Sequence, residues 1–143
     1  FRQVVNLLRP GGHVLVGLYN RIGRLPTDAM RRGRVLFGDA ALFFDRHLHK
    51  DLAADKRRAW IMDQYQHPHE SKHGFSEVLQ WFERAGVTFV SSIPKINGQF
   101  SANEDLFRPQ NPGSASDRLI VELEMLAAGG AEGGLFIMAG RKN

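Results

Sequence analysis

The chain contains no cysteine, so disulfides, thiolate nucleophiles and cysteine-ligated zinc or iron–sulfur sites are excluded. It also lacks an apolar run of roughly 18 residues, the length that a membrane-spanning helix needs. From these absences we expect a cytoplasmic protein with no membrane partner. The first residue is Phe1 rather than Met, and we expect a fragment truncated from a longer protein.

The net charge of +4, from 19 Lys and Arg against 15 Asp and Glu, is concentrated in one segment. Residues 21–34 contain five arginines and one acidic residue, Asp28. Such a segment binds a phosphate, an anionic substrate, nucleic acid or an acidic partner, or it forms a solvated helix face. The arginines do not alternate with aromatic residues, so a nucleic-acid partner is not expected.

Helices and strands alternate along the chain in the manner of an α/β protein. Apolar residues in 1–8 recur at helical spacing, and Pro10 prevents that helix from continuing. The apolar run 13–19 is typical of a strand buried on both faces. The pattern of 75–85 predicts the clearest helix, with Ser76 as its N-cap.

The second half of the chain predicts two more strands and one more helix. Residues 87–93 alternate and are rich in β-branched side chains, and 135–140 form the last strand. Between them, Ser114 and Asp117 form a capping box at the start of a helix that ends near Ala128.

Two long segments interrupt this pattern. Residues 20–73 predict a helical insertion, with one helix starting at Pro26 and further helix over 39–64. Residues 94–133 predict an excursion that is irregular as far as residue 113. We assign the apolar side of the insertion to Phe43, Phe44, Leu48, Leu52, Trp60 and Ile61.

The opening FRQVVNLLRPGGHVLVGLY resembles the helix, Pro-Gly-Gly turn and fifth strand of class I S-adenosylmethionine-dependent methyltransferases. FSEVLQWFERAGVTFV is similar to their last helix and sixth strand, and LFIMAGRK to their seventh strand. The resemblance implies an α/β fold, with residues 1–143 as the C-terminal part of one Rossmann-like methyltransferase sheet. It also implies that the last strand lies antiparallel between the fifth and the sixth.

A narrower resemblance runs through GLYNRIGRL and DQYQHPHESKH. These are similar to a bacterial branch with a Tyr-Asn-x-x-Gly-Arg turn and an Asp-Gln-Tyr-x-His-Pro-x-Glu-x-x-His segment. The resemblance implies that the full-length protein transfers a methyl group from S-adenosylmethionine to a small molecule or another acceptor.

The cofactor motifs of that family have no counterpart in this chain. The family has a Gly-rich turn after its first strand, whereas the Gly-rich stretch 129–134 follows a predicted helix. The family's acidic residue at the end of the second strand is also missing. We therefore assign no cofactor-binding residue, and we expect the chain alone to be inactive and not to bind S-adenosylmethionine.

Candidate acceptor-binding residues stand where the strand 13–19 ends. Ligands of open α/β sheets bind outside the carboxyl ends of the strands, which points to Tyr19 and Asn20. The alternative is a half-buried tyrosine followed by a turn residue.

The segment 63–73 gathers ionisable and aromatic polar groups without an apolar period. We assign Tyr65 and Glu70 to acceptor binding and His73 and His67 to catalysis, as general bases near neutral pH. His73 is favoured because it stands immediately before a predicted helix. We expect this segment beside the end of the strand 13–19, and a structural polar network is the alternative.

Two rival functions follow from other features. His67, His69 and His73 would suit a metal-dependent enzyme, but their spacing differs from His-Glu-x-x-His and no metal site is assigned. The other rival is a non-catalytic binding or oligomerisation module of the same fold. Strand 13–18 would lack the neighbour that the family's fourth strand provides, so we expect a homodimer, strand exchange or aggregation.

Overall fold

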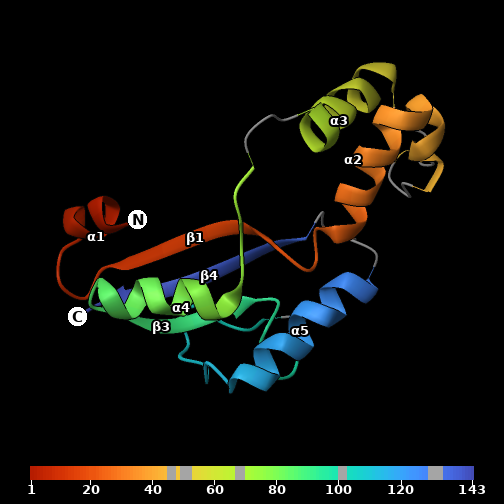
Figure 1. Ribbon diagram of the computed structural model, residues 1–143. Coiled ribbons are helices and arrows are strands. Elements are labelled where there is room, and N and C mark those ends of the chain that lie inside the picture. Colours follow the sequence, from red (N-terminus) through yellow and green to blue (C-terminus); the bar gives the residue numbers. More distant parts are fainter. Residues whose placement is uncertain (45–47, 49–52, 67–69, 100–102, 129–133) are drawn as a thin grey trace.

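The computed structural model describes residues 1–44, 48, 53–66, 70–99, 103–128 and 134–143 (Figure 1). It is an α/β fold with a mixed four-stranded open sheet in the order β2-β1-β4-β3. The elements are α1 (Arg2–Leu7), β1 (His13–Asn20), α2 (Leu25–Phe37), the 3-10 helix η1 (Gly38–Phe44), α3 (Ala54–Gln66), β2 (Lys72–His73), α4 (Phe75–Arg84), β3 (Val87–Ile93), α5 (Ala115–Ala127) and β4 (Leu135–Lys142).

The last strand, β4, lies antiparallel between β1 and β3, as predicted. Its pairing with β1 extends from His13 opposite Arg141 to Tyr19 opposite Leu135. The pairing with β3 shifts register between residues 89 and 91, which is a β-bulge. Because β4 is antiparallel to both neighbours, β1 and β3 are parallel to each other.

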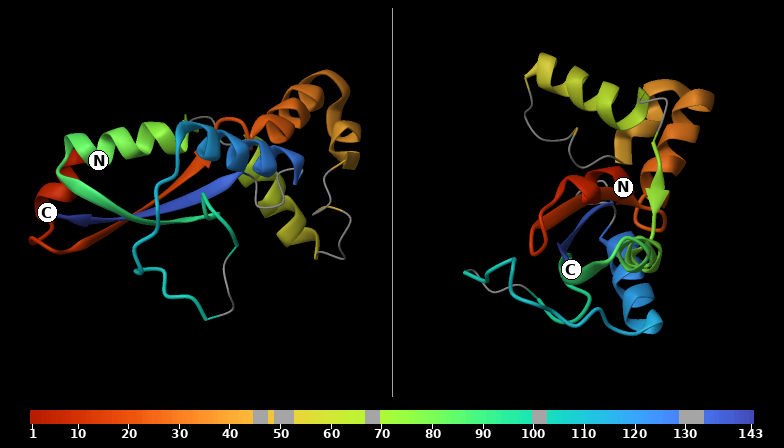
Figure 2. Two further views of the ribbon diagram at one scale, coloured as in Figure 1. Left: turned by 90° about the horizontal axis from the view of Figure 1, so that it is seen from below. Right: turned by 90° about the vertical axis from the view of Figure 1, so that its left-hand side faces the viewer.

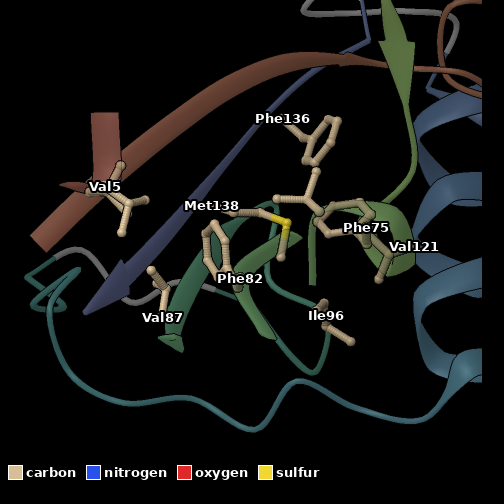
Figure 3. Close-up of a cluster of buried hydrophobic side chains, with 10 residues drawn as sticks. Val5, Phe75, Phe82, Val87, Ile96, Val121, Phe136 and Met138 are labelled. Carbon is tan, nitrogen blue, oxygen red and sulfur yellow. The ribbon is translucent and has the colours of Figure 1, made fainter. Parts of the chain in front are cut away.

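The core lies between one face of this sheet and the helices α4 and α5 (Figures 2 and 3). Phe75, Val78 and Phe82 form the buried side of α4, as their helical spacing predicts. They pack against Phe136 and Met138 of β4, which point to the same face of the sheet.

The opposite face of β1 is not covered by a described helix. Val14 is buried, but the next side chain, Leu15, is 55% exposed. The prediction of a strand buried on both faces is therefore wrong, because α1, α4 and α5 all contribute to one face only. Part of the second face is covered at the start of β1, where the ring centre of Phe107 lies 4.9 Å from that of His13.

The insertion folds as a helical lobe beyond the end of β1 (Figure 1). Pro26 stands in the first turn of α2, as predicted. A second small core joins Leu42 and Leu48 to Met30, Trp60 and Ile61. Phe43 is exposed instead, because the tight turn of η1 directs it away from its neighbour Leu42. Leu52 and the Phe44 side chain lie outside the described part.

The N-terminus of α4 is capped differently from the prediction. Gly74 is the N-cap, and the side chain of Ser76 does not cap the helix. Instead, the backbone N of Phe75 donates to Oε1 of Glu122 in α5 at 2.9 Å. At α5 the predicted capping box is confirmed, since Ser114 and Asp117 exchange hydrogen bonds. No helix within the described ranges is long and apolar enough to cross a membrane.

Candidate functional site at the carboxyl end of β1

Asn20 ends β1 and reverses the chain. Its Oδ1 accepts hydrogen bonds from the backbone N of Ile22 and of Gly23, both at 2.9 Å. The residue is fully buried, and its Nδ2 has no hydrogen-bond partner among the described residues. Asn20 is therefore a turn residue, with an amide nitrogen whose bonding capacity is unused.

This turn brings the guanidinium of Arg24 onto the face of the aromatic ring of Tyr19, the residue before Asn20. The guanidinium carbon of Arg24 lies 4.1 Å from the centre of the Tyr19 ring. A cation over the face of an aromatic ring is attracted by the ring's negative charge distribution. The contact fixes the ring of Tyr19 at the carboxyl end of β1, the position predicted from the sequence.

Glu70 is the carboxylate at the centre of the site. Its Oε1 lies 2.6 Å from Nε of Arg24, and its Oε2 accepts from Arg31 at 2.9 Å. The side chains of Arg24 and Glu70 are only 1% and 6% exposed. This ion pair is well shielded from water, which strengthens the attraction between the two charges. Because Arg24 stands at the start of α2, the pair joins that helix to the segment that leads into β2.

The strand β2 lies beside the end of β1, as expected for residues 72–73. Lys72 pairs with Tyr19 and His73 with Asn20 in parallel register, and the backbone N of Arg21 donates to the carbonyl of His73 at 3.1 Å. Nζ of Lys72 binds Asp28 of α2 at 2.5 Å. Together with the Glu70 pairs, this contact holds the helical lobe to the sheet.

His73 forms a dyad with Glu77, the residue four positions later. Nδ1 of His73 lies 3.0 Å from Oε1 of Glu77, and the other carboxylate oxygen lies 3.4 Å from Arg21. The imidazole also meets the ring of Trp81 edge-on, with 4.6 Å between the ring centres. No described residue hydrogen-bonds to Nε2 of His73, which is the nitrogen left for a proton or a ligand.

Within the dyad, the carboxyl group of Glu77 is stabilised in its ionised form. The hydrogen bond from His73 lowers the pKa of Glu77 below its ordinary value, and the positive charges of His73 and Arg21 add to this effect. Partial burial acts in the opposite direction but does not prevail. When the imidazole is neutral, a carboxylate that accepts from Nδ1–H orients the ring and leaves the lone pair on Nε2.

Trp81 connects this dyad to a surface hollow. A hollow of about 360 Å³ is lined by Trp81, Phe1, Arg2, Arg84 and Ala85. The indole therefore contacts the candidate base on one side and an accessible space on the other.

Four of the six residues predicted for the site lie around the end of β1, in two groups: Tyr19 and Glu70 both contact Arg24, and Asn20 pairs with His73 on the opposite face of the sheet. Tyr65 stands in α3, and its side chain lies outside the described part. His67 and His69 also lie outside it. Among the residues that the structure describes, no three His, Asp or Glu side chains converge as metal ligands.

The side chains that bind these residues were not predicted from the sequence. Arg24 and Arg31 are not part of a solvated helix face, because both bind Glu70. Glu77 could have been predicted from its spacing. It follows His73 by four residues at the start of a helix, and side chains four residues apart lie on the same side of a helix.

No protein-family model matches this chain, and neither a curated protein nor a solved structure shows significant similarity to it.

Proposed function

We propose that the chain is the C-terminal part of a class I S-adenosylmethionine-dependent methyltransferase and forms the acceptor side of its active site. The observation that carries this proposal is the order β1-β4-β3, with an antiparallel strand between two parallel ones. This is the order that the sequence resemblance implies for the fifth, seventh and sixth strands. The polar cluster also lies at the carboxyl end of β1, where open α/β sheets bind ligands.

In this proposal His73 accepts a proton from the methyl acceptor. Glu77 holds the ring through Nδ1, and Nε2 is available to a hydroxyl or amino group of the acceptor. The buried amide of Asn20 stands next to His73 across the β1–β2 pair and borders the acceptor on the same face of the sheet, whereas Tyr19 pairs with Lys72 and its side chain leaves the opposite face. Glu70 acts through Arg24, whose contact with Tyr19 it stabilises, and not on the acceptor itself.

The described residues do not fit the cofactor by themselves. Asp28 and Glu70, the carboxylates nearest to the end of β1, are both bound by basic side chains, so neither is open to a ribose. The Gly-rich stretch lies outside the description except for Gly134, which is packed against the backbone of Gly23. Under this proposal the remainder of a longer protein holds S-adenosylmethionine.

The test uses two proteins, this chain and the longer natural protein that contains it. Calorimetry with S-adenosylmethionine is expected to show micromolar binding by the longer protein and none by the chain alone. Transfer of a labelled methyl group to the components of a cell extract then reports activity. The proposal would be wrong if the longer protein did not bind S-adenosylmethionine.

Variants of the longer protein test the role of His73. His73→Gln is expected to reduce methyl transfer by roughly 100-fold or more while cofactor binding is unchanged, as for the loss of a general base. His13→Gln is the matched control, because His13 begins β1, at the opposite end of that strand from Asn20, which pairs with His73. Equal activity of the two variants would remove the catalytic role from His73.

A binding or oligomerisation module is a second candidate, favoured by the edge of β1. Only the last two residues of β1 pair with β2. Within the described ranges, residues 13–18 have no strand on that edge, and their backbone groups are open to a partner chain.

A further inference from the structure

The last turn of α2 carries three consecutive apolar side chains that are largely exposed. Val35, Leu36 and Phe37 are 84%, 75% and 73% exposed. Successive residues of an α-helix point about 100° apart, so these three project over about 200° around the helix axis. Figures 1 and 2 show this end of α2 far from the sheet, at the outer end of the helical lobe. We name residues 35–37 the apolar tip.

Exposed basic side chains stand beside the apolar tip and on the other side of the lobe. Arg32 is exposed and lies one turn before Leu36, on the same side of α2. At the start of α3 the side chains of Lys56, Arg57 and Arg58 are all exposed. Figure 1 shows the start of α3 as far from the sheet as the end of α2, and both views of Figure 2 show that these two helix ends lie on opposite sides of the lobe. Asp55 offsets one of these charges, and the outer end as a whole is basic.

We propose that the apolar tip and these basic residues bind the surface of an anionic lipid bilayer. A groove on a protein takes up residues spaced three and four apart on one helix face. Three consecutive side chains point in different directions and do not enter one groove together. A fluid apolar layer surrounds all three, while the neighbouring basic groups remain at the level of the lipid phosphates.

This inference goes beyond the proposed methyl transfer and does not depend on it. The sequence argument against a membrane partner concerned helices that span a bilayer, and no described helix is of that kind. Surface binding requires exposed apolar side chains beside basic ones, which is the arrangement at this end of the lobe.

Sedimentation with vesicles tests the proposal directly. The chain is expected to bind vesicles that contain phosphatidylglycerol much more tightly than pure phosphatidylcholine vesicles. The double variant Leu36→Ser/Phe37→Ser is expected to bind about tenfold more weakly, because it removes most of the inserted apolar area. Leu119→Ser/Leu123→Ser is the matched control, since these α5 leucines are also exposed but lie away from the lobe.

A second variant separates the charge from the apolar contact. Arg32→Glu/Arg57→Glu is expected to lose the preference for anionic vesicles, and salt is expected to weaken wild-type binding. Circular dichroism of every variant confirms its fold, and weaker binding by the folded tip variant than by its α5 control supports the proposal. Absence of wild-type binding, or equal binding by the tip variant and its α5 control, would overturn it. So would a dimer in vesicle-free solution that the tip variant abolishes, because the tip would then be a protein–protein contact.

Discussion

Nδ1 of His73 and Oε1 of Glu77 lie 3.0 Å apart, across the junction between β2 and α4. The same carboxylate reaches Arg21, which follows the end of β1. Glu77 therefore links the turn after one strand to the residue that ends its neighbour. Because His73 is also held against Trp81, the imidazole has a fixed orientation, and no described residue hydrogen-bonds to its Nε2.

The variant Glu77→Gln tests the dyad through the pH dependence of stability. The pKa of Glu77 is lowered in the folded protein, chiefly by the His73 hydrogen bond, so the ionised carboxylate stabilises the fold above its ordinary pKa of 4.5. This contribution is lost as the pH falls through the lowered folded-state pKa. Urea unfolding at a series of pH values is expected to show wild type above the variant near pH 6, with the difference vanishing in acid.

Glu83→Gln is the control for this experiment, since Glu83 is exposed on the same helix. Its stability is expected to follow wild type across the series. If both variants show the same pH dependence, the dyad does not stabilise the fold.

The variant Glu70→Gln tests the buried ion pair that holds the lobe. Arg24 is almost completely buried, and without the carboxylate its charge is poorly compensated. Breaking a buried pair from one side costs about 3–5 kcal/mol of unfolding free energy. Hydrogen exchange is expected to accelerate first in α2, whereas Glu124→Gln on the exposed face of α5 changes little. A cost below about 1 kcal/mol for Glu70→Gln would contradict this account.

The open edge of β1 predicts self-association of the chain. Leu15 stands on that strand and is half exposed, and residues 13–18 offer unpaired backbone groups. Light scattering is expected to show concentration-dependent dimers or larger species. Leu15→Lys is expected to shift the equilibrium toward monomer, because a charged residue on an edge strand opposes pairing. Leu119→Lys is the control, because Leu119 is also about half exposed but lies on α5, away from the sheet edge, and a monodisperse wild-type monomer at high concentration would exclude the prediction.

Local patterns were sufficient for most elements of the fold. Helical spacing of apolar residues predicted α4, and alternation with β-branched side chains predicted β3. The burial of β1 was predicted wrongly, because its apolar run does not reveal that helices cover only one of its faces. The Ser76 cap was wrong for a similar reason: a distant carboxylate, Glu122, binds the first backbone N of α4.

The candidate site was predictable in position but not in its ion pairs. Topology placed residues 72–73 beside the end of β1, because segments that follow neighbouring strands meet at one edge of the sheet. The pairing of Glu70 with Arg24 joins residues far apart in the sequence, and no spacing rule selects one arginine among the five in 21–34. Such pairs are decided by the tertiary fold.

The contact between β4 and α4 at Gly140 gives the last prediction. A Cβ at this buried position would lie 2.7 Å from Cε2 of Phe82 and would overlap Cγ1 of Val87. Both neighbours belong to the core, so Gly140→Ala is expected to lower the unfolding free energy by about 1–3 kcal/mol. Gly17→Ala in β1 is the matched control, because a Cβ there meets only Ile137, at 3.9 Å. Thermal unfolding of both variants measures the difference, and equal stabilities would show that α4 moves away from the sheet at little cost.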